Sequence, residues 1–189
     1  MVILFAHGGG VSSEHPWMRA WTERLESIAP VVTFDYPFER GRVVEGLSKL
    51  RAFHCAALRA VEDRRPVVLV GKSLGARVSC LVAAEEQVGA VVCLGYPLSG
   101  RNGAMRDDAL HAITAPVLFV QGAEDELWNP EQLETARASM EIHSELHVVE
   151  GGDHSLLLRG ADAEAQAASD AAVVAHVRRF IEEQVGRLD

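Results

Sequence analysis

The sequence predicts an α/β fold in which a parallel sheet of roughly six strands is flanked by helices on both faces. Short runs rich in valine, isoleucine and leucine recur along the chain, and each is followed by a stretch with helical spacing. The runs are apolar throughout instead of alternating with polar residues, as strands covered on both faces require. The predicted strands are residues 2–6, 31–36, 67–70, 91–94, 117–120 and 146–149.

Helical spacing follows most of these strands. Trp17, Trp21, Leu25 and Ile28 recur at i, i+4, i+8 and i+11, which predicts a core-facing stripe. Residues 160–169 are mostly Ala, Asp, Glu and Gln, and without a strong apolar face they predict a connector or a weak helical extension. The predicted helices are residues 14–27, 43–61, 74–86, 130–140 and 171–185.

Composition bounds the function classes. A chain of 189 residues with 48% hydrophobic and 24% charged residues is typical of one compact domain, expected to cover residues 1–189. Its formal net charge of −9 disfavours nucleic acid and anionic lipid as partners, because both are polyanionic. Small neutral or apolar substrates fit this charge better.

Several features indicate a cytoplasmic protein. No apolar run approaches the ~20 residues of a membrane span. The apolar start at residues 1–6 lacks a basic leader and is read as a strand, not as a signal peptide. The three cysteines, Cys55, Cys80 and Cys93, form no C-x-x-C pair, so we expect free thiols in a reducing compartment and neither a metal site nor a redox site.

Ser73 is the candidate nucleophile. It stands at the centre of Gly71-Lys72-Ser73-Leu74-Gly75, between a predicted strand and a predicted helix. This G-x-S-x-G pattern makes a sharp turn that lifts the serine hydroxyl above the sheet, and its glycines let strand and helix approach each other. Leu74 then presents a backbone N–H at the start of the helix.

This segment also fits two other patterns. Gly71-Lys72-Ser73 matches the end of the phosphate-binding pattern G-x-x-x-x-G-K-[ST], but Pro66 occupies the position of its first glycine and strand residues replace its loop. Ser73 could also be an ordinary helix N-cap. The nucleophile interpretation is favoured because other parts of an acyl-transfer site occur elsewhere in the chain.

The first of these parts is His7-Gly8-Gly9-Gly10, directly after the first predicted strand. Glycine-rich loops at this place can supply an N–H to an oxyanion hole. The N–H groups of Gly9 and Leu74 are therefore predicted to face the oxygen on which charge develops. The alternative is a flexible loop, and His7 itself is expected to be structural.

Asp125 is the candidate acid. It lies in an acidic turn after the strand at 117–120, at the sheet edge where ligands of parallel sheets gather. A carboxylate here would accept the Nδ1 hydrogen of the base and orient its ring. Glu124 and Glu126 are rivals, and a solvated turn is the alternative for all three.

His154 is the candidate base. Of the eight histidines, it alone lies on a glycine-hinged loop after the last predicted strand, with His15 the other candidate at a loop edge. His143 and His147 would lie on one face of a strand about 13 Å apart, too far to share a metal ion without other ligands. We expect no metal and no cofactor.

With these motifs the chain resembles the lid-less α/β-hydrolases of the dienelactone-hydrolase-like group, and most closely the family of testis-expressed protein 30 and NSL-complex subunit 3. The resemblance implies the α/β-hydrolase fold in a minimal form, with the second strand at one edge of the sheet, and a triad of Ser73, Asp125 and His154. Dienelactone hydrolases proper use a cysteine nucleophile, whereas residue 73 is serine. The matching segments are residues 6–8, 16–18, 32–37, 71–77, 95–98, 121–125 and 150–155.

The function predicted is a serine hydrolase of small carboxylic esters or thioesters. The alternative is a catalytically silent binding or scaffold protein that keeps the fold. Only residues 96–115 separate the fourth and fifth predicted strands, where larger relatives insert a lid, so the site should be shallow. Tyr96, Pro97 and Trp128 are predicted to contact the acyl group, and Trp17 and Trp21 to lie in the core.

Overall fold

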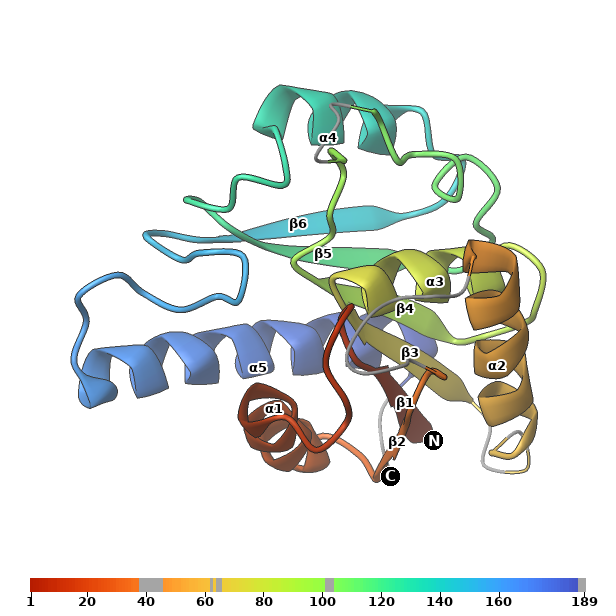
Figure 1. Ribbon diagram of the computed structural model, residues 1–189, viewed down its shortest axis with the longest axis horizontal. Coiled ribbons are helices and arrows are strands. Elements are labelled where there is room, and N and C mark those ends of the chain that lie inside the picture. Colours follow the sequence, from red (N-terminus) through yellow and green to blue (C-terminus); the bar gives the residue numbers. More distant parts are fainter. Residues whose placement is uncertain (38–45, 62, 64–65, 101–103, 187–189) are drawn as a thin grey trace.

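Six parallel strands form one sheet in the order β2-β1-β3-β4-β5-β6 (Figure 1). The computed structural model describes residues 1–37, 46–61, 63, 66–100 and 104–186. The predicted six-stranded parallel sheet is confirmed, with the second strand at one edge. The strands are β1 Val2–Ala6, β2 Val31–Phe34, β3 Val67–Lys72, β4 Ala90–Leu94, β5 Val117–Gly122 and β6 Ser144–Val149.

Helices cover both faces of this sheet. One core cluster joins the strands to α2 (Leu47–Arg59), α3 (Leu74–Ala83) and α4 (Pro130–Ala138). The other joins them to α1 (Pro16–Glu26) and α5 (Ala163–Val185). Alternate residues of β1 enter opposite clusters, and all five are fully buried, which explains why the strands are apolar throughout.

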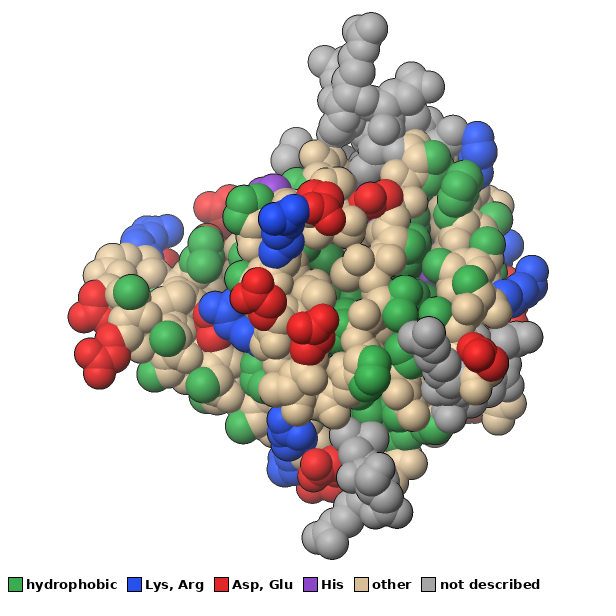
Figure 2. All heavy atoms as spheres, turned by 90° about the horizontal axis from the view of Figure 1, so that it is seen from below, with side chains coloured by type: hydrophobic (Ala, Val, Ile, Leu, Met, Phe, Trp, Pro, Cys, Tyr) green, Lys and Arg blue, Asp and Glu red, His purple; other side chains and the backbone are tan. Residues whose placement is uncertain are grey.

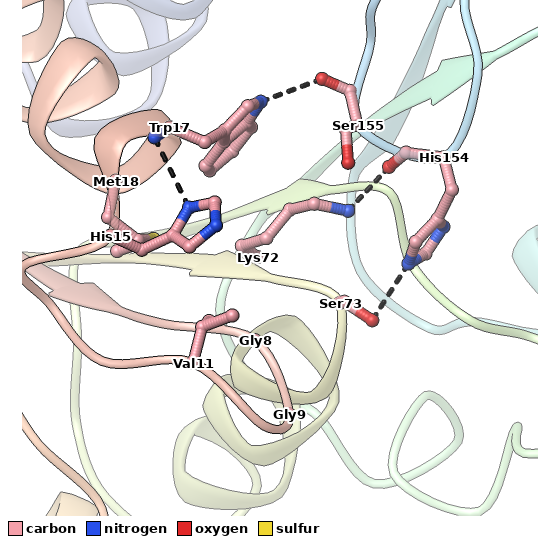
Figure 3. A pocket seen from close by; sticks show the side chains of 10 residues that line it. All are labelled: Gly8, Gly9, Val11, His15, Trp17, Met18, Lys72, Ser73, His154 and Ser155. Atoms are coloured by element: carbon pink, nitrogen blue, oxygen red, sulfur yellow. Dashed lines mark hydrogen bonds between the residues drawn. The ribbon is translucent and has the colours of Figure 1, made fainter. Parts of the chain in front are cut away.

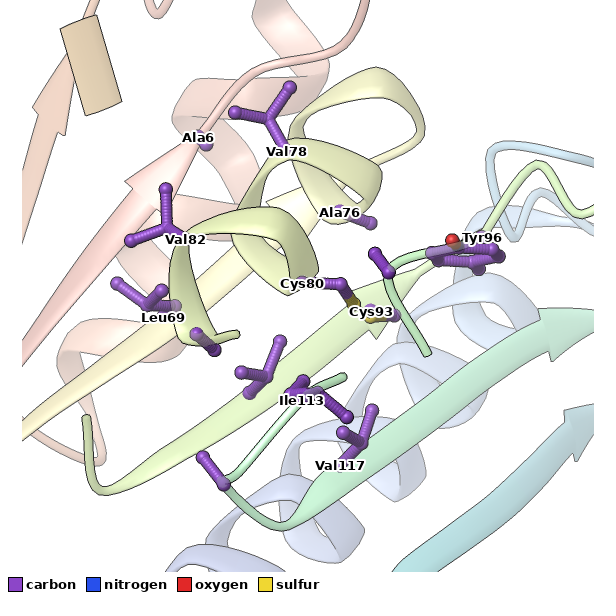
Figure 4. Close-up of a cluster of buried hydrophobic side chains, with 14 of the residues drawn as sticks. Ala6, Leu69, Ala76, Val78, Cys80, Val82, Cys93, Tyr96, Ile113 and Val117 are labelled. Carbon is purple, nitrogen blue, oxygen red and sulfur yellow. Dashed lines mark hydrogen bonds between the residues drawn. The ribbon is translucent and has the colours of Figure 1, made fainter. Parts of the chain in front are cut away.

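In the core on the α3 face, the small and branched side chains of α3 pack against the strands, and larger rings such as Tyr96 lie beside them (Figure 4). Ala76 and Cys80 of α3 face the strands, and the Cys80 sulfur lies 3.6 Å from that of Cys93 on β4. All three cysteines are buried free thiols. Small residues on α3 let this helix lie close to β3 and β4.

The observed boundaries differ from the predicted ones at several ends. β3 and β5 each continue two residues beyond the predicted end, to Lys72 and Gly122, so both strands reach the loops at the sheet edge. α1 begins at Pro16 because the His15 side chain accepts a hydrogen bond from the Trp17 N–H. Residues 43–45 of the second predicted helix lie outside the described residues, and α2 begins at Leu47.

Of the two alternatives for residues 160–169, the helical extension is the one observed for most of its length, since α5 begins at Ala163. Asp162 caps the helix by accepting a hydrogen bond from the Ala165 N–H at 2.8 Å. Gln166 bonds Leu158 N and Leu156 O, and Asp170 pairs with Arg24 at 2.6 Å. Polar contacts, which a hydrophobic pattern does not show, therefore stabilise the first turns of α5.

The surface mixes charges of both signs. On the face drawn in Figure 2, acidic and basic side chains are interspersed with hydrophobic ones. Within the described part of the chain, no helix is both long enough and apolar enough to cross a bilayer.

Replacing Asp162 with alanine tests the capping of α5. Because the Ala165 N–H loses its acceptor, the free energy of unfolding should fall by about 1 kcal/mol, measured by urea denaturation. Glu164→Ala, on the exposed first turn of the same helix, is the control and should change stability by no more than about 0.5 kcal/mol. Equal losses would contradict the capping role.

Candidate active site

Ser73 occupies the turn between β3 and α3 in a strained conformation. Its φ of 52° and ψ of −113° place it among the two described non-glycine residues with positive φ. Such backbone conformations are unfavourable by about 1–3 kcal/mol and persist only where the surroundings impose them. The hydroxyl is thereby held above the carboxyl end of the sheet.

The two glycines of the motif make this turn possible. A Cβ atom on Gly71 would lie 2.3 Å from the Ala76 nitrogen, and one on Gly75 would lie 2.4 Å from the Ala6 carbonyl oxygen. Both distances are too short for any side chain, and in both cases the obstructing atom is backbone. The start of α3 is therefore packed directly against β1 and β3.

His154 contacts Ser73 from the loop after β6. Its Nε2 lies 2.9 Å from the Ser73 Oγ. The loop is braced from within, because the Asp153 carboxylate accepts hydrogen bonds from the N–H groups of Ser155 and Leu157, at 2.7 and 3.0 Å. Leu156, buried in the core, has a positive φ of 62°.

Asp125 contacts the other side of the His154 ring. Its Oδ2 lies 2.7 Å from Nδ1, and its Oδ1 accepts the Leu127 N–H at 2.8 Å. The side chain is fully buried. Glu124 and Glu126 are exposed, and Glu124 pairs with Arg159 instead. Of the three acids considered from sequence, Asp125 is therefore the one that meets the histidine.

The loops that carry Asp125 and His154 touch through their backbones. The Glu124 N–H donates to the Gly152 carbonyl oxygen at 2.8 Å. A Cβ atom on Gly122 would lie 2.2 Å from the Asp153 oxygen and 2.3 Å from the Gly152 oxygen. The separation of the carboxylate from the imidazole thus follows from backbone packing.

The loop after β1 lines the same pocket as His154. His7 is fully buried, accepts the Tyr36 N–H at its Nε2 and lies 2.8 Å from the Gly8 oxygen at Nδ1. Burial lowers the pKa of His7, so the neutral ring that donates from Nδ1 is favoured. Among the described residues, the N–H groups of Gly9 and Leu74 have no hydrogen-bond acceptor.

A pocket of about 170 Å³ opens beside Ser73 (Figure 3). Several of its lining residues were not predicted from the sequence. Trp17, predicted to lie in the core, packs against the core and lines this pocket as well. The signal available was position alone, since α1 begins just after the glycine loop and its first turn faces this edge of the sheet. The missed lining residues are Val11, His15, Trp17, Met18 and Lys72.

Comparisons with known proteins agree with this arrangement. Residues 1–182 match the protein family described as alpha/beta hydrolase domain. The chain belongs to this α/β-hydrolase family. Its fold is shared with solved structures. The order Ser73, Asp125, His154 along the chain is the order in which α/β-hydrolases carry their nucleophile, acid and base.

Three solved structures illustrate the likeness of this α/β-hydrolase to others. DcsB in complex with its substrate analogue is 15% identical, with a TM-score of 0.78 over 98% of this chain and 91% of its own. Dienelactone hydrolase from Anabaena variabilis is 23% identical, with a TM-score of 0.75 over 97% and 86%. Est1E from Butyrivibrio proteoclasticus, with ferulic acid bound, is 19% identical, with a TM-score of 0.72 over 98% and 90%. At these identities the likeness concerns the fold.

Two residues predicted to contact substrate lie elsewhere in this α/β-hydrolase. Tyr96 is fully buried and donates its hydroxyl hydrogen to the Arg106 oxygen at 2.7 Å. Trp128 is 8% exposed and donates from Nε1 to the Gly122 oxygen at 2.8 Å. Because each polar atom is satisfied by a backbone carbonyl, both rings can be buried in the core, and neither lines the pocket. Pro97 is buried as well.

The backbone strain at Ser73 can be tested through stability. Ser73→Gly should be more stable than Ser73→Ala by about 1 kcal/mol, because glycine adopts positive φ without strain and this gain exceeds its larger loss of chain entropy. Urea denaturation of the two variants measures the difference. A more stable alanine variant would contradict the assignment of strain.

Proposed function

We propose that this α/β-hydrolase is a serine hydrolase of small carboxylic esters or thioesters. The observation that carries the proposal is the hydrogen-bonded chain from the Ser73 hydroxyl through the His154 ring to the Asp125 carboxylate, with distances of 2.9 and 2.7 Å. A serine hydroxyl is a weak nucleophile until a base takes its proton. This arrangement supplies the base and the group that orients it.

The proposed reaction has two halves. Ser73 Oγ attacks the substrate carbonyl while His154 Nε2 takes the hydroxyl proton, and Asp125 stabilises the imidazolium that forms. The tetrahedral intermediate collapses to an acyl-enzyme, and His154 returns the proton to the departing alcohol or thiol. Water then attacks the acyl-enzyme with the same base, which releases the acid and regenerates the Ser73 hydroxyl.

The N–H groups of Gly9 and Leu74 are proposed to form the oxyanion hole. Both residues flank Ser73, Gly9 in the pocket lining and Leu74 as the first residue of α3. Removing one such donor typically lowers turnover ~10²–10³-fold, because the charge that develops on the oxygen loses a preorganised partner. A strained serine and unpartnered donors together prepare the site before substrate arrives.

The substrate class follows from the pocket and from the chain's relatives. A pocket of about 170 Å³ lined by Val11, Trp17 and Met18 fits a short apolar acyl group. The structure of Est1E holds ferulic acid, and dienelactone hydrolase is another neighbour. We also propose that the chain is a member of the dienelactone-hydrolase-like group, related to testis-expressed protein 30 and NSL-complex subunit 3. The proposal includes a cytoplasmic location, which suits three free thiols.

A fluorophosphonate probe tests the nucleophile. The purified protein should be labelled, and Ser73→Ala should abolish labelling while the thermal unfolding transition remains. Ser79→Ala is the matched control, because Ser79 lies in α3 just after Ser73 and its hydroxyl donates to the Gly75 carbonyl oxygen within that helix. The control should be labelled like the parent protein. An unlabelled parent protein would favour a scaffold that keeps the fold without turnover.

The acid can be tested against its neighbour. Asp125→Asn should lower kcat for p-nitrophenyl acetate by about 10⁴-fold, because the amide favours the wrong histidine tautomer. Glu124→Gln, one residue away and paired with Arg159, should leave kcat within about twofold. Similar losses in both variants would remove Asp125 from its proposed role.

A further inference from the structure

Lys72 is a buried cation that the proposed reaction does not use. It is the last residue of β3, next to Ser73, and only 7% of it is exposed. Its sequence context matched the end of a phosphate-binding loop. In the structure its ammonium group instead donates a hydrogen bond to the backbone carbonyl oxygen of His154.

Trp17 holds the next carbonyl along the same loop. Its Nε1 donates to the Ser155 oxygen at 2.8 Å. The Lys72 ammonium lies over the Trp17 ring, 5.6 Å from its centre, at a distance where a cation and an aromatic face attract each other. Figure 3 shows both side chains directed toward the loop of His154 and Ser155. Two mutually contacting donors thus bind two consecutive carbonyls.

We propose that Lys72 and Trp17 are positioning residues that hold the His154 imidazole within hydrogen-bonding distance of Ser73. The inference rests on the proposed serine hydrolase activity. The His154 ring is bonded by Asp125 on one side, but its backbone must also be placed so that Nε2 reaches the hydroxyl. Lys72 binds the His154 carbonyl oxygen from β3, and Trp17 binds the neighbouring Ser155 carbonyl oxygen from α1; both elements are far from β6 in sequence.

Packing alone does not account for a lysine at this position. Among the described residues no carboxylate lies within ion-pair distance of its ammonium group, and burying a charge without such a partner is unfavourable. Methionine has a similar length and would fill the volume without that desolvation. The role that requires a lysine is donation of a charge-assisted hydrogen bond to the loop.

Because the proposed role depends on the charge of Lys72, activity should depend on the protonation of its amine. Burial lowers the pKa of Lys72 to about 8, and this lowering is opposed by the carboxylates of Asp125 and Asp153. His154 and His15 are the other titratable groups beside it in the pocket. The ammonium form prevails below pH 8, so its attraction to the Trp17 ring and its strong hydrogen bond should weaken as the pH rises through 8.

The experiment compares Lys72→Met with the parent protein and with Lys49→Met, which removes an exposed lysine on α2. For p-nitrophenyl acetate, Lys72→Met should lower kcat and the fluorophosphonate labelling rate at least tenfold with KM within about twofold, because a small misplacement of a catalytic group lowers the rate and not the binding. The parent protein should lose activity above pH 8, and Lys72→Met should lack this decline. Lys49→Met should match the parent protein in both respects.

Trp17→Phe provides a second variant that keeps an aromatic ring but removes the Nε1 donor. It should lower kcat severalfold and retain the decline above pH 8, since Lys72 remains. Should Lys72→Met fail to fold, as judged by thermal unfolding, this variant and the pH profile of the parent protein still decide the matter. The inference fails if Trp17→Phe turns over at the parent rate and the parent profile is flat through pH 8.

Two other outcomes distinguish failure of the positioning role from failure of the proposed hydrolase activity. A folded Lys72→Met variant with parental kcat but raised KM would overturn the positioning role and make Lys72 a substrate contact. A parent protein that neither reacts with the probe nor hydrolyses the ester refutes the proposed function instead. Because labelling of the parent protein is measured first, the two failures are distinguishable.

Discussion

The close approach of α3 to the ends of β1 and β3 is the constraint on which the site depends. Gly71 and Gly75 leave no room for a side chain between these elements, so the chain must turn within a single residue. That residue, Ser73, takes a positive φ and projects its hydroxyl out of the sheet. The first N–H of α3, that of Leu74, has no acceptor among the described residues. The proposed nucleophile and one donor of the proposed oxyanion hole therefore come from one packing contact.

Much of this arrangement could be predicted because parallel strands bring their carboxyl ends to one edge. Ser73, Asp125 and His154 each follow a continuously apolar strand, so their meeting follows from topology. Topology does not distinguish Asp125 from its neighbours. The structure does, because the turn after β5 buries residue 125 and exposes residues 124 and 126. Helix periodicity could not show this, since the choice depends on contacts with the loop after β6.

The two aromatic residues whose predicted substrate contact is not observed share one property. Tyr96 and Trp128 each carry a polar atom on a large ring. In the core, this atom donates to the backbone carbonyl of a residue several positions away in the sequence, Arg106 or Gly122. Trp17 packs against the core as its apolar spacing predicted, but its Nε1 donates to the Ser155 oxygen in the loop after β6, which places the ring in the pocket lining as well. Whether an aromatic ring lies in the core or in a pocket depends on where its donor finds an acceptor, and spacing carries no information about that.

Gly122 joins the turn of Asp125 to the loop of His154 so closely that even a methyl group would collide with two carbonyl oxygens. The consequence is a restriction on which amino acid this position can carry. Any amino-acid substitution at this position adds at least a Cβ atom, which would force the two loops apart together with the side chains they carry. Residue 122 must therefore stay glycine for as long as these two loops keep their backbone contact.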